Sequence, residues 1–247
     1  MDKKTTLYQD LLTAISGKKK LLAVLIDPDK TNPETISAFI KKVNASIATH
    51  IFVGGSTVDE TITEIVVSEI KKHTQLPVLL FPGDVTQITE NADALLFLSL
   101  LSGRNPDYLI GKHVESISQL RDSKLEIIPT GYILIENGKV TSIEKITFTL
   151  PMPRKNIQNI ADTAKAGELL GMKLIYLEAG SGALHPITHE IISAVKNDLY
   201  IPLIVGGGII SIMQLEAAYN AGADLVVIGT AFETDESFFD ELKKSQS

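Results

Sequence analysis

The sequence contains no cysteine and no tryptophan among its 247 residues, and only 6% of the residues are aromatic. The absence of cysteine excludes a disulfide framework, a thiolate metal site and cysteine catalysis. No apolar run approaches the ~18 residues that a membrane-spanning helix needs. The N-terminus also carries no apolar block followed by a small-residue cleavage site, so we expect a cytoplasmic protein without an integral membrane segment.

Positive charge is also in short supply. There are 23 Lys and Arg residues against 30 Asp and Glu residues, which gives a formal net charge of −7. Broad electrostatic binding of nucleic acid needs a basic face, and an anionic membrane surface would repel an acidic protein. We therefore expect no nucleic acid among the partners of this chain.

Short apolar runs recur along the chain, and amphipathic stretches separate them. Runs of about four to eight apolar residues are typical of strands that are buried on both faces of a parallel sheet. The runs are Leu21–Ile26, His50–Val53, Pro77–Phe81, Ala94–Leu98, Leu125–Ile135, Leu174–Glu178, Pro202–Val205 and Leu225–Ile228. Together with a helical pattern at Leu7, Leu11, Leu12 and Ile15, they predict a single α/β domain over residues 1–247: a (β/α)8 TIM barrel preceded by an N-terminal helix. A doubly wound open sheet is the alternative.

Two segments depart from the regular alternation of strands and helices. Residues 82–93 are too few for a full crossover helix and its two loops, so the third helix of the barrel is expected to be short or missing. After the fifth run, Asn137-Gly138 lies between alternating apolar residues, which is the strongest short signal for a hairpin turn. We interpret residues 136–155 as a hairpin and loop insertion on the catalytic face, where it can act as a lid.

The loops after the strands carry the candidate site residues, because barrel enzymes build their sites at the carboxyl ends of the strands. The first run ends at Asp27-Pro28-Asp29, whose carboxylates suit Mg²⁺, a hard cation that takes oxygen ligands. Function is the favoured interpretation for Asp27, whereas Asp29 and Lys30 fit an ordinary surface turn. The second run ends at Gly54-Gly55-Ser56-Thr57, which suits either an anion site or a simple helix cap.

The sixth run ends with a tyrosine and a glutamate at alternate positions, Tyr176 and Glu178. Alternation places both on the face toward the barrel mouth and Leu177 on the face toward the helices. A glutamate at the end of a buried strand is costly unless it is hydrogen-bonded or functional. Glu178 is therefore the best candidate for a general base, with structural burial by pairing as the alternative, and the following Gly/Ser loop is interpreted as an anion nest.

Glycine-rich loops follow the last two strands, at Gly206-Gly207-Gly208 and at Gly229-Thr230. Loops after strands seven and eight form the recurrent phosphate cradle of these barrels, and glycine lets backbone N–H groups reach phosphate oxygens. This pattern is specific for a phosphate but not for a reaction. Arg104 fits a phosphate contact and a solvated loop charge equally well.

Several motifs, taken in their order along the chain, resemble those of the geranylgeranylglyceryl phosphate synthase family. They are Ile26-Asp27-Pro28-Asp29-Lys30, Gly54-Gly55-Ser56, Ser99–Pro106, Thr130-Gly131-Tyr132, Tyr176–Gly182, Gly206–Gly208 and Gly229-Thr230. The resemblance covers nearly the whole chain, and the family is a modified barrel that lacks the third helix. It implies Mg²⁺-dependent transfer of a prenyl group from an allylic diphosphate, first of all geranylgeranyl diphosphate, to the 3-hydroxyl of sn-glycerol 1-phosphate.

The resemblance also implies roles for individual residues. Asp27 and Ser56 would hold the metal, and Glu178 would take the hydroxyl proton. The glycerol phosphate would be held by Tyr176, Leu177, Glu178, Ala179, Gly180, Ser181, Gly182, Gly207, Gly208, Gly229 and Thr230. Tyr132 and Phe97 are expected to line an apolar groove for the prenyl tail, on the flank that the missing helix opens.

The resemblance further separates two branches of the family. One branch has a lysine two residues before the metal-binding aspartate, where this chain has Leu25. The chain therefore resembles the other branch, which occurs in archaea and some bacteria. Members of the family form dimers or hexamers, so a homo-oligomer is expected.

Two other functions are compatible with the same scaffold. A sugar-phosphate isomerase or aldolase would share the phosphate cradle, but it needs a carboxylate acid–base pair or a Schiff-base lysine, and no lysine ends a predicted strand. A non-catalytic module that binds phosphate metabolites would have no use for Asp27 and Glu178.

Overall fold

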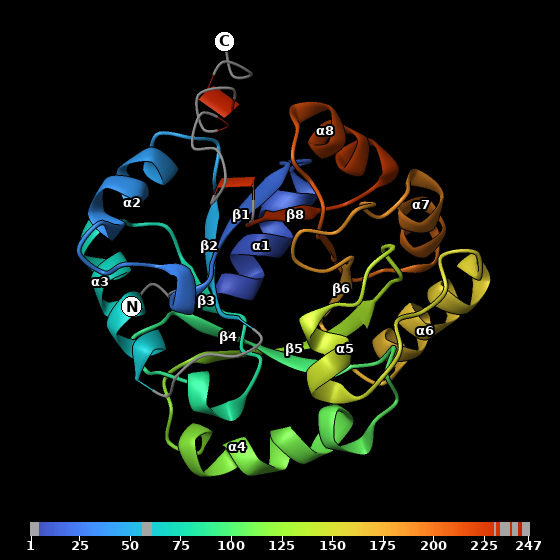
Figure 1. The fold of residues 1–247 in the computed structure, drawn as a ribbon, viewed down its shortest axis with the longest axis horizontal. Coiled ribbons are helices and arrows are strands. Elements are labelled where there is room, and N and C mark those ends of the chain that lie inside the picture. Colours follow the sequence, from blue (N-terminus) through green and yellow to red (C-terminus); the bar gives the residue numbers. More distant parts are fainter. Residues whose placement is uncertain (1–4, 56–60, 230, 233–237, 239–241, 244–247) are drawn as a thin grey trace.

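The computed structural model describes residues 5–55, 61–229, 231–232, 238 and 242–243. Its parallel strands pair in sequence order and close on themselves between the last and the first, which forms a barrel (Figure 1). The strands are β1 (Leu21–Ile26), β2 (His50–Val53), β3 (Val78–Leu80), β4 (Ala94–Leu100), β5 (Glu126–Leu134), β6 (Leu174–Glu178), β7 (Leu203–Gly206) and β8 (Leu225–Ile228). The prediction of a (β/α)8 barrel is therefore confirmed, and the open sheet is not observed.

Helices surround the ring of strands (Figure 1). The outer helices are α2 (Ile36–Asn44), α3 (Ile62–His73), α4 (Lys112–Leu120), α6 (Ile157–Leu169), α7 (His189–Asp198) and α8 (Ile212–Ala221). Two further helices, α1 (Leu7–Ser16) and α5 (Ser142–Thr147), and three short helical turns, η1 (Pro28–Lys30), η2 (Val85–Gln87) and η3 (Asp107–Gly111), complete the described elements. None of the helices among the described residues is long and apolar enough to cross a membrane.

The N-terminal helix α1 closes the end of the barrel at which the strands begin. Leu11 packs with the side chains inside the barrel. The carboxylate of Glu126, the first residue of β5, accepts hydrogen bonds from the backbone N–H groups of Leu7 at 2.5 Å and Tyr8 at 3.1 Å. These bonds satisfy free amides of the first helical turn and place a negative charge at the positive end of the helix. The opposite end of the barrel is left for the functional loops.

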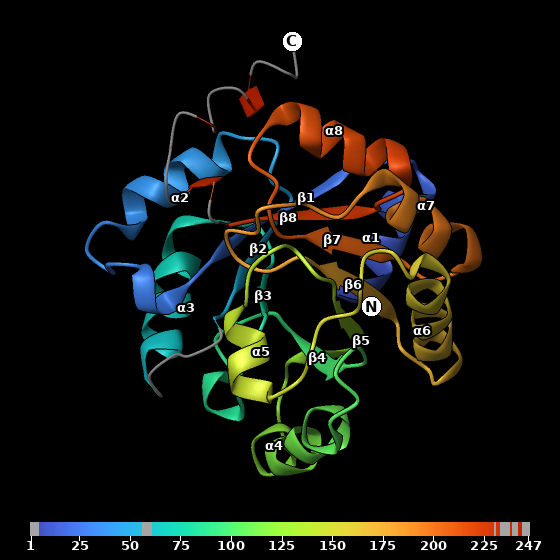
Figure 2. The same ribbon diagram turned by 45° about the vertical axis from the view of Figure 1, so that its right-hand side comes forward.

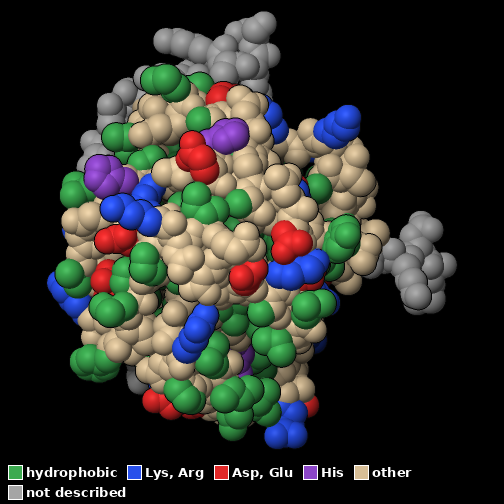
Figure 3. Space-filling model, turned by 90° about the vertical axis from the view of Figure 1, so that its right-hand side faces the viewer, with side chains coloured by type: hydrophobic (Ala, Val, Ile, Leu, Met, Phe, Trp, Pro, Cys, Tyr) green, Lys and Arg blue, Asp and Glu red, His purple; other side chains and the backbone are tan. Residues whose placement is uncertain are grey.

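The apolar core has two layers, because successive side chains of a strand point to opposite faces. Leu21 and Ala23 of β1 point inside the barrel, whereas Leu22 and Val24 pack between the strands and the helices. Apart from Glu178, the described Asp, Glu, Lys and Arg residues are not buried in this core. On the face drawn in Figure 3, the described Lys, Arg, Asp and Glu side chains are interspersed with hydrophobic ones and do not gather into one basic area.

The third helix of a regular barrel lies between the third and fourth strands, so it is not the helix labelled α3. Its expected shortening is confirmed. Between β3 and β4 the described chain contains only the single 3-10 turn η2, whereas α3 and α4 flank it as full helices. A crossover between parallel strands of this length leaves no room for a full helix and its loops. The outer layer of the barrel is therefore incomplete on this flank.

The predicted hairpin within residues 136–155 is wrong, although an insertion does leave β5 at this point. The segment is a loop that contains the short helix α5. In Figure 2 this helix lies apart from the outer ring of helices. Thr141 begins this helix with a capping box: its hydroxyl accepts from the N–H of Glu144 at 3.2 Å, and the Glu144 carboxylate accepts from the N–H of Thr141 at 2.7 Å. The cap outweighs the Asn-Gly turn signal, because it satisfies two backbone donors at once.

Candidate active site

A cavity of about 620 Å³ opens at the carboxyl ends of the strands. Its lining combines two kinds of wall. Polar and glycine positions come from the loops after the strands: Asp27, Asp29, Lys30, Gly54, Gly55, Gly180, Ser181, Gly182, Gly207, Gly208 and Gly229. Apolar side chains come from η2, β4, α5 and their neighbours: Val85, Ile88, Leu95, Leu96, Phe97, Leu98, Tyr108, Ile143 and Ile146. The cavity can therefore hold a molecule with a polar head and a long apolar tail.

The structure brings most of the predicted site residues to this cavity. Asp27, Tyr176, Glu178, Gly180, Ser181, Gly182, Gly207, Gly208 and Gly229 all line it, as do Tyr132 and Phe97. Leu177 and Ala179 are different, because their side chains pack in the outer core layer and only their backbone faces the loop. Ser56, Thr57 and Thr230 lie outside the described residues.

The two arginines of the neighbouring loops do not line the cavity. Arg104 is exposed, with a backbone in the left-handed region at φ 52°. Arg154 donates to the backbone carbonyls of Glu136 at 2.9 Å, His185 at 3.2 Å and Pro186 at 2.5 Å. Arg154 thus joins the insertion to the loop after β6, which is a structural role.

Glu178 lies at the floor of the polar part and is almost completely buried, with 5% of its surface exposed. Burial raises the pKa of its carboxyl group to about 7, although the hydrogen bond from the Gly180 N–H lowers it in part. The Gly180 N–H donates to Glu178 Oε1 at 2.6 Å. A carboxyl group that is half ionised near neutral pH is suited to take and to return a proton.

Two tyrosines flank this carboxyl group and remain neutral. The pKa of Tyr176 and that of Tyr132 lie well above the ordinary value, because both phenols are buried and the Glu178 charge adds to the effect. The two rings meet edge to face, with centroids 5.3 Å apart. They form an apolar wall that keeps the carboxyl group poorly solvated.

The glycines at the end of β7 make room for these side chains. A Cβ atom on Gly206 would lie 2.4 Å from the Tyr176 hydroxyl, and one on Gly207 would lie 2.3 Å from Glu178 Oε1. Gly207 also has a φ of 86°, which residues other than glycine rarely adopt. The glycine triplet predicted as a phosphate cradle is therefore also required by the general-base candidate.

Asp27 lies across the cavity at the end of β1 and begins the turn η1. Its Oδ1 accepts from the N–H of Asp29 at 3.2 Å, and its Oδ2 pairs with the Lys30 ammonium at 3.0 Å. Within the described ranges no cluster of three His, Asp or Glu side chains is placed to hold a metal ion. Asp27 lines the cavity together with the carboxylate of Asp29.

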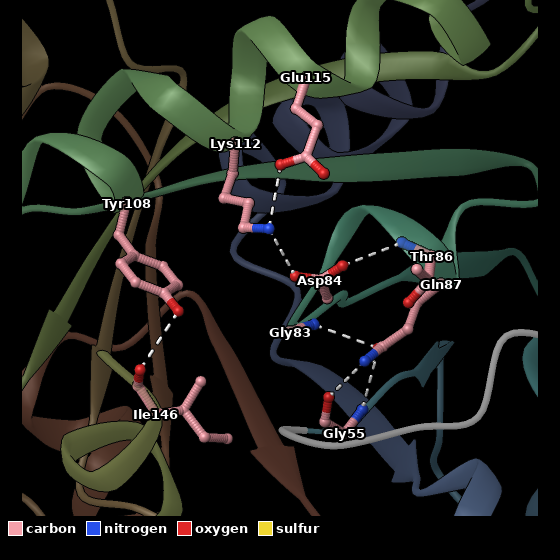
Figure 4. A network of polar contacts seen from close by, with 9 residues as sticks. All are labelled: Gly55, Gly83, Asp84, Thr86, Gln87, Tyr108, Lys112, Glu115 and Ile146. Carbon is pink, nitrogen blue, oxygen red and sulfur yellow. Dashed lines mark hydrogen bonds and ion pairs between the residues drawn. The ribbon is translucent and has the colours of Figure 1, made fainter. Parts of the chain in front are cut away.

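A polar network bridges the flank on which the third helix is missing (Figure 4). Lys112 of α4 pairs with Asp84 at 2.9 Å and with Glu115 at 3.0 Å. Gln87, 1% exposed, donates to the Gly55 carbonyl at 2.9 Å and accepts from the Gly83 N–H at 3.1 Å. The network ties η2 to the loop after β2 and to α4, and no local sequence signal pointed to it.

A second pair that the sequence did not reveal includes His113, which lines the apolar part of the cavity. The Ser99 hydroxyl and His113 Nε2 are 3.1 Å apart, and both side chains are buried. Burial lowers the pKa of His113, which favours its neutral form. The His113 ring meets Phe97 edge to face at 4.3 Å between centroids.

Comparison with known proteins places the chain in a family. The PcrB family model matches residues 15–246. The geranylgeranylglyceryl phosphate synthase of Flavobacterium johnsoniae is 54% identical over 236 residues, which are 96% of this chain and 97% of that protein. The protein of the same name from Zunongwangia profunda is 54% identical over 226 residues, 92% of this chain and 96% of its own.

A solved structure resembles the whole barrel. The (S)-3-O-geranylgeranylglyceryl phosphate synthase from Thermoplasma acidophilum, in complex with its substrate sn-glycerol-1-phosphate, superposes with a TM-score of 0.90 at 31% identity. The match covers 97% of this chain and 96% of the other. The resemblance seen in the motifs is confirmed: the chain belongs to the PcrB family, together with these geranylgeranylglyceryl phosphate synthases.

Proposed function

We propose that this enzyme transfers a prenyl group from an allylic diphosphate to the 3-hydroxyl of sn-glycerol 1-phosphate. Geranylgeranyl diphosphate is the first candidate for the donor. The observation that carries the proposal is the single cavity in which glycine loops, a poorly solvated glutamate and an apolar groove meet. The relatives that carry the synthase name support it over nearly the full length of the chain.

The two walls of the cavity match the two ends of such a reaction. Backbone N–H groups of the loops after β6, β7 and β8 suit a phosphate, because glycine leaves them unobstructed. The side chains from η2, β4 and α5 suit a prenyl tail, whose burial is favourable by roughly 25 cal/mol per Å². A sugar-phosphate isomerase or aldolase would have no use for this second wall.

In the proposed reaction the glycerol C3 oxygen attacks the first carbon of the prenyl chain. The new C–O bond forms as the bond to the diphosphate oxygen breaks, and the electron pair of that bond leaves with diphosphate. The hydroxyl proton passes to a carboxylate oxygen of Glu178, which burial keeps basic enough to accept it. Tyr176 and Tyr132 exclude water from the reacting centre.

The donor set at Asp27 fits Mg²⁺. This ion is usually held by one or two carboxylates and completed by substrate phosphates and water, so a three-residue cluster is not required. Asp27, with Ser56 as the second predicted ligand, would hold it in the cavity. When bound, Mg²⁺ neutralises the charge that develops on the leaving diphosphate.

Incubation of the purified protein with Mg²⁺, geranylgeranyl diphosphate and glycerol phosphate tests the proposal. We expect a prenyl ether with sn-glycerol 1-phosphate and little with its mirror image, sn-glycerol 3-phosphate. Absence of any ether from the 1-phosphate, with donors of several chain lengths, would overturn it. A homo-oligomer, dimer or hexamer, and a cytoplasmic location are further proposals from the family resemblance, which light scattering and cell fractionation test.

A further inference from the structure

Asn137 is a buried polar residue that the proposed reaction does not use. It follows β5 in the insertion and is only 2% exposed. Its Nδ2 donates a hydrogen bond to the backbone carbonyl of Ala179, and its Oδ1 accepts from the N–H of Lys139 at 3.0 Å. A buried side-chain amide with both ends bonded holds its partners in one geometry.

The carbonyl that Asn137 holds belongs to the peptide group between Ala179 and Gly180. The N–H of the same peptide group donates to Glu178 Oε1 at 2.6 Å. A peptide group is planar and its C=O and N–H point in opposite directions, so a bond that fixes the oxygen also fixes the direction of the N–H. Asn137 and the Glu178 carboxylate are thus joined through one rigid unit.

Glycine at position 180 makes this unit dependent on its surroundings. Gly180 has a φ of 98°, a conformation that glycine adopts readily. Because glycine also adopts many other conformations, the chain after Gly180 can turn unless its neighbours restrain it. A Cβ atom there would lie 2.6 Å from Thr141 Cγ2 and 3.2 Å from Asn137 Nδ2, so both residues of the insertion press against it. Before Gly180 in the chain, the Ala179 N–H donates a hydrogen bond to the Gly206 carbonyl at 3.1 Å.

We propose that Asn137 is a positioning residue for the reaction: it fixes the peptide group between Ala179 and Gly180, which in turn holds the Glu178 carboxylate charged and aimed into the cavity. The inference rests on the proposed function, in which Glu178 takes the hydroxyl proton. By this inference the start of the insertion positions the general base, whereas α5 of the same insertion lines the apolar wall.

The groups around Glu178 leave this peptide as a principal support of its charge. Tyr176 from its own strand and Tyr132 from β5 face it as neutral phenols, and the β7 side offers only the backbone of Gly206 and Gly207. Lys139 of the insertion lies over Gly182: a Cβ atom on Gly182 would be 3.0 Å from Lys139 Nζ. Loss of the Gly180 N–H from the carboxylate would therefore raise the pKa of Glu178 above its present value of about 7.

The pH dependence of kcat/KM in Asn137→Ala tests the inference. We expect the acid limb to move up by about one pH unit, which is the loss of one hydrogen bond to a charged group, and the plateau to fall about tenfold. Asn105→Ala is the matched control, because Asn105 Nδ2 holds the Thr147 carbonyl at 3.0 Å and its Oδ1 accepts from the Asp107 N–H at 3.0 Å. The control removes the same kind of bond, made to the insertion at Thr147 from the loop after β4, and should leave the acid limb where it is.

A purely structural role would lower the plateau or the melting temperature of Asn137→Ala without moving the limb, and that result overturns the inference. If wild-type protein makes no prenyl ether at all, the proposed function fails instead, so the two failures are distinguishable. A measurement on the wild-type protein applies even where the variant does not fold. The NMR shifts of the Asn137 side-chain amide and the Gly180 N–H should titrate with one midpoint, and a flat Asn137 signal contradicts the coupling.

Discussion

Among the described residues, Glu178 is the carboxyl group that combines burial with a position at the end of a strand that opens into the cavity. Glu178→Gln keeps the shape but can neither accept the proton nor ionise. We expect kcat to fall at least about 100-fold, the usual contribution of a positioned general base, and the acid limb near pH 7 to disappear from the rate profile. Steady-state rates of ether formation between pH 5.5 and 9 measure both effects.

Glu136→Gln is the control for this change, because Glu136 is an exposed carboxylate at the start of the same insertion. It should leave the profile unchanged. Near-wild-type turnover by Glu178→Gln would remove Glu178 from the reaction.

Asp27 supplies a prediction about the metal. Asp27→Asn retains an oxygen that can cap η1, so the fold is preserved, but the neutral amide binds a divalent cation far less well than a carboxylate. We expect loss of Mg²⁺ binding in calorimetric titrations with inorganic diphosphate present, together with loss of activity. Asp29→Asn, two residues along the same turn, should bind Mg²⁺ as the wild type does. Equal Mg²⁺ affinity in the two variants would contradict the assignment of Asp27.

At the scale of single residues, the sequence revealed the part of the site that depends on strand alternation. Tyr176 and Glu178 were expected on one face toward the barrel mouth, and both line the cavity. The Lys112–Asp84 and Ser99–His113 pairs were not expected, because each joins residues from separate elements whose approach only the closed barrel determines. No local pattern encodes such a contact.

At the scale of elements, the insertion shows where sequence patterns compete. Asn137-Gly138 has the composition of a tight turn, but the Asn137 side chain bonds outside its own segment, to Ala179. Ile143 and Ile146, which follow it, are three positions apart, belong to α5 and line the cavity. A hairpin prediction considers only the local segment. The bond of Asn137 goes to the loop after β6, and the helix begins at the cap of Thr141.

The cap of α5 gives a prediction at this scale. Thr141→Val keeps the shape and the methyl group that packs on Gly180 but removes the hydroxyl, whereas Thr141→Ser keeps the hydroxyl. Loss of an N-cap costs about 1 kcal/mol, which is large for a helix of six residues. We expect the amides of α5 to exchange with deuterium several-fold faster in Thr141→Val, with a higher KM for the prenyl diphosphate and a similar kcat. The same exchange rates in the valine and serine variants would show that the cap does not hold this wall.

At the scale of the whole molecule, the closed barrel was predictable because its strands are apolar on both faces and recur at regular intervals. Each strand lies within a few residues of its expected range, and the short crossover at residues 82–93 is the one the sequence singled out. The sequence could not specify how the incomplete flank is closed. The Gln87 and Lys112 contacts that bridge it arise only when β2, η2 and α4 meet.

Two buried titratable groups affect the stability of the whole barrel in opposite directions. Burial lowers the pKa of His50, near the start of β2, to about 4, and it raises the pKa of Glu178 to about 7. Below pH 6.5 His50 becomes protonated in the unfolded chain but stays neutral in the folded chain. His50 therefore reduces stability as the pH falls toward 4. Between pH 7 and 4.5 the folded chain instead binds a proton at Glu178 that the unfolded chain lacks, so Glu178 increases stability as the pH falls.

Each of these shifts corresponds to about 3 kcal/mol, since one pKa unit is about 1.4 kcal/mol. We therefore expect the two slopes to cancel in the wild-type protein between about pH 4.5 and 6.5 and to separate in single variants. Relative to the wild type, Glu178→Gln should become more stable as the pH rises from 4.5 to 7, and His50→Gln should become more stable as it falls from 6.5 to 4. Urea unfolding at half-unit steps of pH measures both differences, and the double variant should show their sum, because the groups lie at opposite ends of the barrel. A pH-independent difference between either variant and the wild type would mean that the corresponding group titrates alike in the folded and unfolded chain.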